Sequence, residues 1–293
     1  MSYDWHRSLE AAEGTREFFD AIDARLFNAS PFFQGKRPFE RFIPFEVLKG
    51  KRVLEIGCGL GSHAELFARA GCRLTAIDLT EKAVELTRER LRLRGFPADI
   101  RRMDAEEMEF QNGEFDFVWS WGVIHHSADP ERIIRNVYRV LKDGGEFRFM
   151  VYHRRSLNAF TSIVRGFLSG KVFQGMSASD ILSFYTDGYV ARFYTQAEVS
   201  KFLSRARFLK VSTCVLGQKS ELVPLPARGL VGQLKSFILK NFPGPVAEYF
   251  LSSYGALLFA IASKSCEPKS EERSSVDRQN DTNISRQGVS RCI

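Results

Sequence analysis

Three glycines and an aspartate near the start of the chain are spaced as in a nucleoside-binding site. Gly57, Gly59 and Gly61 follow a short apolar run, and Asp78 closes a second apolar run. Glycine permits positive φ angles and lets a ligand approach the main chain closely. A carboxylate about 20 residues beyond the first glycine can accept hydrogen bonds from both hydroxyls of a ribose. The pattern therefore predicts a nucleoside ligand.

Glu55 and Ser62 distinguish this turn from a dinucleotide-binding loop. In the G-x-G-x-x-G/A loop, the last small residue lets the helix pack beneath a pyrophosphate. Here Gly61 comes one residue early and Ser62 takes the final position. The charge of Glu55, just before the turn, would repel a pyrophosphate but suits a ligand with an ammonium group. S-adenosylmethionine has an ammonium group and no phosphate, so the residues favour it over NAD.

The elements around these residues form a predicted βαβ unit. The run Arg52–Ile56 predicts a buried strand, Ser62 can cap the following helix, and Gly71 can end that helix in a left-handed conformation. The run Arg73–Ile77 predicts the second strand. Ligands of open α/β sheets bind at the carboxyl ends of such strands.

The segment from Lys51 to Asp78 resembles motif I of the class I methyltransferases, (V/I)LE(I/V)GCGxG. A second stretch, FDFVWSWGVIHHSADP from Phe115 onward, is similar to the family's (F/Y)DxVxSxxVLHHxxDP, and LKDGG at 141–145 is similar to its LKPGG. The resemblance implies a Rossmann-like three-layer α/β sandwich with a seven-stranded, mostly parallel sheet whose last strand is antiparallel. The chain as a whole is similar to the ubiquinone/menaquinone-methyltransferase-like (type 11) group, whose members methylate many small molecules.

The resemblance implies S-adenosyl-L-methionine as the cofactor and assigns residues to it. Asp104, followed by Ala105, would hydrogen-bond the adenine amino group, although a loop aspartate that caps the next turn is the alternative. Ser120, Trp121 and Gly122 would line the sulfonium and methyl end. The full set of cofactor-binding candidates is Glu55, Gly57, Cys58, Gly59, Gly61, Asp78, Leu79, Asp104, Ala105, Ser120 and Trp121. In addition, Asp116 would support the glycine turn.

His125 and His126 are the candidates for a catalytic base. Methyl transfer is an in-line displacement that depends mostly on positioning, but a hydroxyl or acidic carbon acceptor must also lose a proton. An unperturbed histidine, with a pKa of about 6.5, suits that step. The alternative is a structural histidine that hydrogen-bonds the loop or stacks near the cofactor. His153 and Tyr152 are the next candidates, whereas His63 is expected to pack.

The remaining segments surround this core. The predicted organisation is a lid or helical segment over 1–50, a methyltransferase domain over 51–263 with acceptor-side insertions at about 153–194 and 217–253, and a disordered tail over 264–293. Phe18, Ile22 and Leu26 share a helical face, so the first segment can pack on the domain edge, close the cofactor pocket, or both. The aromatic insertions could wall an apolar acceptor pocket or simply pack a cap onto the sheet.

Composition narrows the partners. The net charge of +7 is attributed to solvated arginines such as Arg88, Arg90, Arg92 and Arg94, so it does not by itself require an acidic partner. A nucleic-acid methyltransferase is disfavoured for two reasons. The N/D-P-P-Y signature of amino methylation is absent, since no Pro-Pro occurs, and no cysteine that could attack a base follows the fourth predicted strand. The favoured activity is O- or C-methylation of a small, partly apolar molecule. An RNA or protein methyltransferase and a non-catalytic cofactor-binding protein remain alternatives, and the oligomeric state is open.

Cysteine content and apolar stretches bear on location. Five cysteines without a C-x-x-C pair predict free thiols in a reducing compartment and no metal site. The N-terminus lacks the apolar core of a secretory signal, and no apolar stretch reaches the length of a membrane span, so a cytoplasmic protein is expected. The stretch LVGQLKSFILKNF at 230–242, with Lys235 and Lys240, could nevertheless lie on a membrane surface.

Overall fold

The computed structural model describes residues 10–28, 33, 35–186, 191–223 and 229–265. From residue 266 onward, the predicted disordered tail lies outside these ranges. The strands are β1 (Arg52–Ile56), β2 (Arg73–Asp78), β3 (Asp99–Arg102), β4 (Phe115–Trp121), β5 (Leu141–His153), β6 (Phe193–Tyr194), β7 (Leu209–Leu216) and β8 (Leu257–Ser263). The α-helices are α1 (Arg16–Asn28), α2 (Phe45–Leu48), α3 (Ser62–Arg69), α4 (Glu81–Arg94), α5 (Pro130–Val140), α6 (Leu157–Leu168), α7 (Ala178–Thr186), α8 (Gln196–Arg205), α9 (Gly229–Asn241) and α10 (Gly244–Tyr254). Short 3-10 helices are η3 (Ala105–Glu107), η4 (Ile124–His126), η5 (Val172–Gln174) and η6 (Lys219–Glu221).

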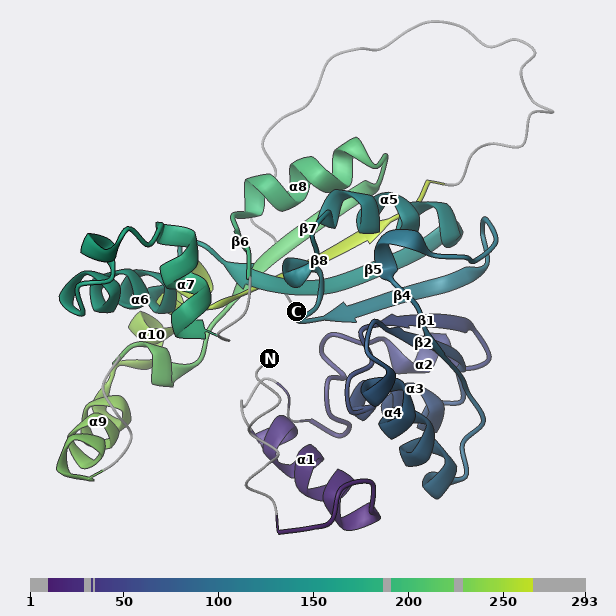
Figure 1. Ribbon diagram of the computed structural model, residues 1–293, viewed down its shortest axis with the longest axis horizontal. Helices are drawn as coiled ribbons and strands as arrows, with labels where there is room; N and C mark the ends of the chain where they lie inside the picture. The colour runs from purple at the N-terminus through teal and green to yellow at the C-terminus, as the bar shows by residue number, and fades with distance from the viewer. Residues whose placement is uncertain (1–9, 29–32, 34, 187–190, 224–228, 266–293) are drawn as a thin grey trace, which may run out of the picture.

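The strands form one mixed sheet through the middle of the molecule (Figure 1). Within the described residues, seven strands follow the order β3-β2-β1-β4-β5-β8-β7, and the short β6 pairs with β5 beside this path. β8 is antiparallel to both β5 and β7, whereas the pairs among β1 to β5 are parallel. The predicted Rossmann-like α/β fold, with a mostly parallel sheet and an antiparallel last strand, is confirmed.

Helices cover both faces of the sheet, which explains why the central strands are continuous apolar runs. Leu54 of β1 shares one buried cluster with Ile133 of α5 and Leu203 of α8. Val53, whose side chain points to the opposite face, shares a second cluster with helices α3 and α4. Since β1 is buried on both faces, a ligand can reach its main chain only at the end of the strand.

Residue types that favour helix ends lie at several helix ends in the structure. The Thr80 side chain accepts a hydrogen bond from the Ala83 amide at the start of α4, and Gly95 ends that helix with a φ of 74°. Asp129 caps α5, and Thr195 forms a capping box with Glu198 at α8. Each cap satisfies amide groups that have no partner within the helix. These caps fix where the helices begin relative to the strand ends.

Ser62 is not the N-cap of α3, so this prediction is wrong. The N-cap is Gly61, whose φ of 77° is left-handed, and no side chain caps the helix. Ser62 is the first helical residue, and its hydroxyl donates to Asp23 Oδ1 at 2.8 Å. Because Asp23 belongs to α1, this hydrogen bond ties the N-terminal helix to the glycine turn.

Arg90 of α4 is fully buried, so the prediction that the arginines of this helix are solvated is wrong for it. Its Nε donates to Glu65 Oε2 of α3 at 2.7 Å, and its Nη2 pairs with Asp23 of α1. Burial raises the pKa of Asp23 despite this pairing. For Glu65, burial also raises the pKa, but Arg90 and Arg69 outweigh it and hold the pKa below its usual value. One buried cation therefore joins three helices.

Asp116 lies at the end of β4 away from the glycine turn, so its implied support of that turn is wrong. Its Oδ2 accepts a hydrogen bond from the Arg52 amide at 2.8 Å, and its Oδ1 accepts one from Lys142 Nζ at 2.6 Å. Asp116 therefore holds the start of β1. β5 begins at Leu141, so the LKDGG stretch at 141–145 lies within this strand, where its register against β4 shifts.

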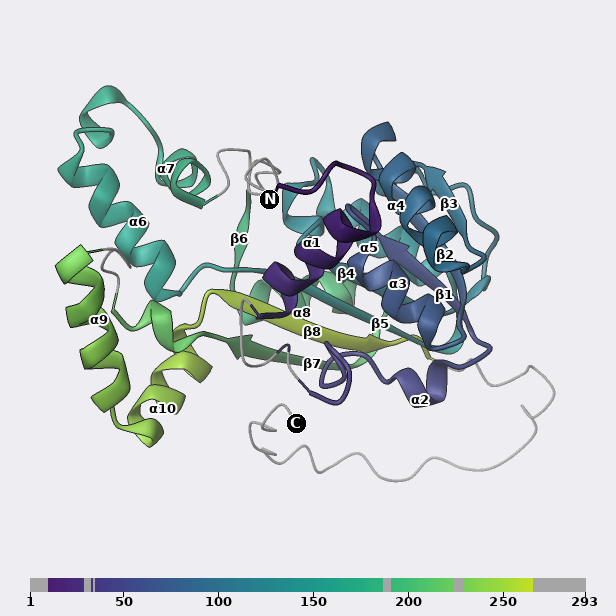
Figure 2. The same ribbon diagram turned by 90° about the horizontal axis from the view of Figure 1, so that it is seen from below.

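Two excursions of the chain form a group of helices at one end of the sheet, which we call the lobe: α6, η5 and α7 after β5, and α9 and α10 between β7 and β8. They fall within the segments predicted as insertions. Figures 1 and 2 both place the lobe beyond the carboxyl end of β5, with α6 and α9 farthest from the centre of the sheet. In the part of the chain that the structure describes, no helix has the length and apolar character to cross a membrane.

The described cysteines differ in state. Cys58 and Cys72 are free thiols, as predicted, and burial raises the pKa of Cys72 to about 11. Cys214 is disulfide-bonded, so the prediction of free thiols is wrong for it. Among the described residues, no group of histidine, cysteine and carboxylate side chains could hold a metal ion.

Candidate active site

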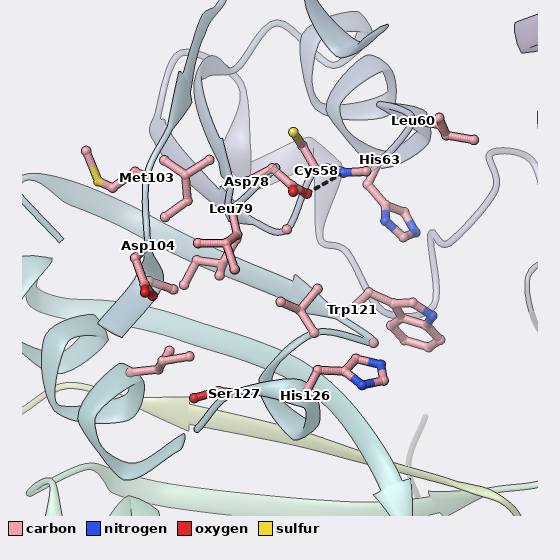
Figure 3. A pocket seen from close by; sticks show the side chains of 18 of the residues that line it. Cys58, Leu60, His63, Asp78, Leu79, Met103, Asp104, Trp121, His126 and Ser127 are labelled. Atoms are coloured by element: carbon pink, nitrogen blue, oxygen red, sulfur yellow. Dashed lines mark hydrogen bonds between the residues drawn. The ribbon is translucent and has the colours of Figure 1, made fainter. Parts of the chain in front are cut away.

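A cavity of about 570 Å³ lies at the carboxyl ends of β1, β2 and β4 (Figure 3). This volume is within the range of small-molecule sites. The predicted site residues that line it are Gly57, Cys58, Gly59, Asp78, Leu79, Asp104, Ala105, Trp121 and His126. The predicted residues Glu55, Gly61, Ser120 and His125 are not among its lining residues. The sheet thus brings most of the predicted site residues to one place.

The glycine turn forms the wall of the cavity nearest β1. Gly57, Gly59 and Gly61 have φ angles of 78°, 54° and 77°, which side chains rarely tolerate. A Cβ on Gly57 would lie 2.2 Å from Val123 Cγ2, so only glycine fits there. A Cβ on Gly61 would lie 3.1 Å from Arg90 Cδ. Gly61 therefore lets α4 pack closely, while Gly57 and Gly59 border the cavity.

Asp78 ends β2 and binds the glycine turn directly. Its Oδ2 accepts a hydrogen bond from the Gly59 amide at 3.0 Å, and its Oδ1 accepts from the amide and hydroxyl of Thr80 at 3.0 and 2.9 Å. An ionised carboxylate offers about four acceptor positions. Three are occupied, so one remains for a hydroxyl of a ligand in the cavity.

Asp104 follows β3 and lines the cavity while it also caps η3. Its Oδ1 accepts a hydrogen bond from the Glu106 amide at 2.8 Å. The capping role that the sequence offered as an alternative is therefore present. The adenine role stays a prediction, and it is compatible with the cap because Asp104 also borders the cavity.

Glu55 lies behind the lining, against His63. Glu55 is 1% exposed, and its Oε1 lies 3.8 Å from His63 Nδ1. Burial, followed by the charge of Asp78, raises the pKa of Glu55 well above its usual value. Within the described residues, Glu55 Oε2 and His63 Nε2 have no hydrogen-bond partner. Such unpaired buried polar atoms are costly, so they indicate groups that a ligand can satisfy.

His63 lines the cavity, a role that the sequence did not predict. Its ring packs edge-on against Phe39 at 4.5 Å between centroids and lies near Trp119 and Trp121, so the expected packing role also holds. Burial, followed by the charge of Arg90, lowers the pKa of His63 to about 3, so the imidazole is neutral at pH 7. Its place in the first turn after the glycines is the one signal that could have identified it.

Trp121 and Ser120 differ although they are neighbours on β4. Trp121 lines the cavity and stacks on Trp119 with ring centroids 5.6 Å apart. Ser120 points to the other face of the strand, where it is fully buried and its hydroxyl donates to the Ile56 carbonyl at 3.3 Å. The alternation of a strand separates the two, so the implied place of Ser120 at the methyl end is wrong.

The two adjacent histidines of η4 have different environments. His126 lines the cavity beside Trp121, and Figure 3 shows both opposite Asp78. His125 is 0% exposed, and its ring packs between His126 and Tyr152, with centroids 4.2 and 4.0 Å away. Neither ring nitrogen of His125 has a hydrogen-bond partner among the described residues, and burial holds its pKa well below the usual value. Of the two candidates, His126 alone faces the cavity.

The alternative bases do not line the cavity. His153 Nδ1 lies 3.0 Å from the Gly255 carbonyl in a buried position, and burial lowers the pKa of His153. Tyr152 stacks between His125 and Phe193. Tyr152 therefore supports η4, whereas His153 ties the end of β5 to the segment before β8.

Further lining residues come from elements whose contribution the sequence left open or missed. Ile22 and Leu26 of α1 line the cavity, so this helix both packs on the domain and borders the site. Ser127 and Glu106 also line it, and Ser127 Oγ donates to Glu106 Oε1 at 2.6 Å. By contrast, no described aromatic side chain of the lobe lines the cavity.

Comparison with known proteins identifies this domain. Residues 54–149 match the family model described as a methyltransferase domain. The chain is similar to a ubiquinone biosynthesis O-methyltransferase of Aromatoleum aromaticum, with 39% identity over 108 residues, 36% of this chain and 46% of that protein. It is also similar to a sarcosine/dimethylglycine N-methyltransferase of Halorhodospira halochloris, with 39% identity over 100 residues, 33% of this chain and 36% of that protein.

A solved structure extends the fold comparison. Phosphoethanolamine N-methyltransferase 2 of Haemonchus contortus, in complex with S-adenosyl-L-methionine, superposes with a TM-score of 0.56 at 19% identity, over 90% of this chain and 56% of that one. At this identity the likeness concerns the fold. The two curated relatives are each matched over less than half of their length. The family match and the fold agree: residues 54–149 of this chain belong to a methyltransferase domain, and the domain has the Rossmann-like class I fold.

Proposed function

We propose that this protein transfers the methyl group of S-adenosylmethionine to a hydroxyl or an acidic carbon of a small, partly apolar molecule. The observation that carries this proposal is the position of His126, a titratable side chain on the cavity wall opposite Asp78 and the glycine turn (Figure 3). Small-molecule sites typically combine apolar walls with a few placed polar groups. Here Ile22, Leu26 and Trp121 supply apolar surface near that histidine.

The residues present fit the cofactor. Glu55 Oε2 is a buried acceptor without a partner among the described residues. It suits the ammonium group of the methionine end, which must reach past the lining residues to pair with it. The remaining acceptor position of Asp78 suits a ribose hydroxyl. Gly57 and Gly59 line the cavity, so main chain without side chains borders the ligand there. Bound S-adenosylmethionine supplies an already activated methyl group, so the donor requires no further activation.

The protein's own contribution is then to position the acceptor and remove its proton. Trp121 presents its ring to the acceptor side of the cavity, and its stacking on Trp119 fixes the ring orientation. An imidazole nitrogen of His126 takes the proton of the acceptor as the acceptor atom bonds to the methyl carbon. His125, neutral and buried behind His126, supports the ring without taking part in proton transfer.

The test combines acceptor identification with two variants. Purified protein is incubated with S-adenosylmethionine carrying a deuterated methyl group and a metabolite extract, and mass spectrometry detects the labelled product. With that acceptor, His126→Gln should lower turnover by about 10²- to 10⁴-fold while calorimetry shows little change in cofactor affinity. Unchanged turnover would remove His126 as the base and would favour an acceptor, such as a neutral amine, that needs none.

A further inference from the structure

In the lobe, large apolar side chains are exposed to solvent. Apart from Val47, Leu79 and Leu209, every exposed large hydrophobic side chain among the described residues lies in α6, η5, α7, α9 or α10. Phe160, Leu168 and Phe173 are 67%, 78% and 78% exposed, and Leu230 and Phe237 are 82% and 67% exposed. Scattered apolar side chains are normal on a protein surface, but such a concentration on one part of it marks an interaction site.

Small residues, by contrast, face the interior of the lobe. The buried residues of α6 are Ala159, Ser162 and Gly166, and Gly232 is the buried residue of α9. A Cβ on Gly166 would lie 2.5 Å from Ile181 Cγ2 of α7, so these two helices touch through a glycine. Helices that pack through small residues and present large apolar ones outward are typical of proteins in contact with lipid.

The charges of the lobe specify the kind of surface it fits. α6 and α9 carry Arg165, Lys235 and Lys240 and no acidic residue, whereas α7 carries Asp180 and α10 carries Glu248. Lys171, between α6 and α7, lies over the ring of Phe184 with its Nζ 3.9 Å from the centroid. Basic side chains among exposed apolar ones favour the headgroup region of an anionic membrane. A second copy of the chain would instead place the cations of both copies in one interface, since a two-fold interface joins the same surface patch of each copy.

We propose that the lobe docks this protein on an anionic membrane surface, with the exposed side chains of α6 and α9 inserted among the lipid headgroups. The lobe follows the carboxyl end of β5, the same edge of the sheet at which the cavity lies. Docking through the lobe therefore brings the edge of the sheet that holds the cavity toward the lipid. The attachment is peripheral, and it does not depend on which acceptor the protein methylates.

The test is co-sedimentation of the full-length protein with vesicles of phosphatidylcholine alone and with vesicles containing half phosphatidylglycerol. We expect binding to the anionic vesicles that weakens as salt is raised. The variant Phe160→Asp/Phe237→Asp should lower the partition coefficient by about tenfold or more. Val47→Asp is the matched control, because Val47 is also 67% exposed but lies in α2, outside the lobe; it should bind as the parent does.

Three results would overturn the proposal. The first is absence of binding to anionic vesicles by folded protein, as judged by circular dichroism. The second is equal binding to both vesicle types, or equal loss in Val47→Asp and the lobe variant. The third is a dimer in light scattering that dissociates in Phe160→Asp/Phe237→Asp without vesicle binding by the parent, since the lobe would then be an interface between copies. None of these measurements requires methyl transfer, so they are independent of the proposed activity.

Discussion

At the scale of single residues, the site depends on side chains that complete the hydrogen bonding of the main chain. Asp78 shows this most clearly, because it holds the Gly59 amide and Thr80 and still has one acceptor position. A carboxylate so placed stabilises the glycine turn before any ligand binds. The turn and the proposed ribose contact therefore depend on the same side chain.

Replacement of Asp78 tests this dual role. Asp78→Ala should weaken cofactor affinity by about 1 to 3 kcal/mol, the cost of leaving buried polar groups without partners. Titration calorimetry with S-adenosylmethionine gives the difference. Asp116→Ala is the control. This aspartate lies near the start of β4, at the edge of the sheet opposite the cavity, where it binds the Arg52 amide and Lys142. An affinity equal to that of the parent would exclude Asp78 from ribose binding.

The buried imidazole of His125 predicts a pH dependence of stability. Its pKa in the folded state lies well below 6.5, whereas the unfolded chain binds a proton near pH 6.5. Below that pH the unfolded state therefore binds more protons, and the free energy of unfolding decreases as pH falls. His125→Phe removes this contribution, so its stability relative to the parent should rise by about 1.4 kcal/mol per pH unit below 6.5.

Denaturant titrations of both proteins between pH 7 and pH 5 measure this difference. Other groups that titrate in this range are present in both proteins and largely cancel. His126 and Tyr152 contact the ring of His125, so the comparison requires that both side chains keep their positions in the variant. A stability difference that does not change with pH would mean that His125 binds its proton over the same pH range in the folded and the unfolded state.

At the scale of secondary-structure elements, Arg90 links the N-terminal helix to the cofactor-binding unit. Its guanidinium pairs with Glu65 of α3 and Asp23 of α1, and its Nη1 donates to the hydroxyl of Ser62 at 3.2 Å. A buried charge that loses a partner is strongly destabilising. The position of α1, which lines the cavity through Ile22 and Leu26, therefore depends on an ion pair beneath the site.

Removal of one partner should loosen α1 without unfolding the domain. Asp23→Ala leaves the pair of Arg90 with Glu65 intact but detaches α1, so hydrogen exchange in α1 should become faster and cofactor affinity should fall. Asp20→Ala is the matched control one turn earlier in α1. Asp20 pairs with Arg94, but the Asp20 side chain is 62% exposed. Surface ion pairs contribute about 0 to 1 kcal/mol, so this change should have little effect. Equal exchange in the two variants would contradict the role of Arg90.

The elements also show what the sequence could and could not predict. Most signals confined to a few neighbouring residues succeeded, as with Thr80 and Asp129 at helix starts and the carboxylate of Asp78 at a strand end, although the cap predicted at Ser62 did not. Predictions that depended on distant contacts failed. Nothing in the sequence of α4 shows that Arg90 meets Asp23, which lies far earlier in the chain. Ser120 failed because one residue along a strand changes the face on which a side chain lies.

At the scale of the whole molecule, the second excursion of the lobe leaves the sheet and rejoins it at neighbouring points of β7 and β8. A Cβ on Gly255 would lie 2.3 Å from the Leu216 carbonyl oxygen, so the ends of β7 and β8 meet closely where the second excursion leaves the sheet. Leu216 and Leu257 are paired in antiparallel register at that point. The chain therefore returns almost to its starting point after α9 and α10, as it would after a tight hairpin.

This geometry predicts that the second excursion can be removed. Replacement of residues 218–254 by Asn-Gly, which together with the retained Gly255 makes a three-residue loop of a kind common between antiparallel strands, should leave a folded protein that binds S-adenosylmethionine, because none of the described residues in that segment lines the cavity. The hydrogen bond from the Ala256 amide to Glu221 is lost, so the melting temperature should fall by a few degrees. Calorimetry and thermal unfolding measure both effects. Loss of cofactor binding in a folded variant would show that the core and the lobe form one cooperative unit, because the lobe would then hold the cavity in shape from a distance.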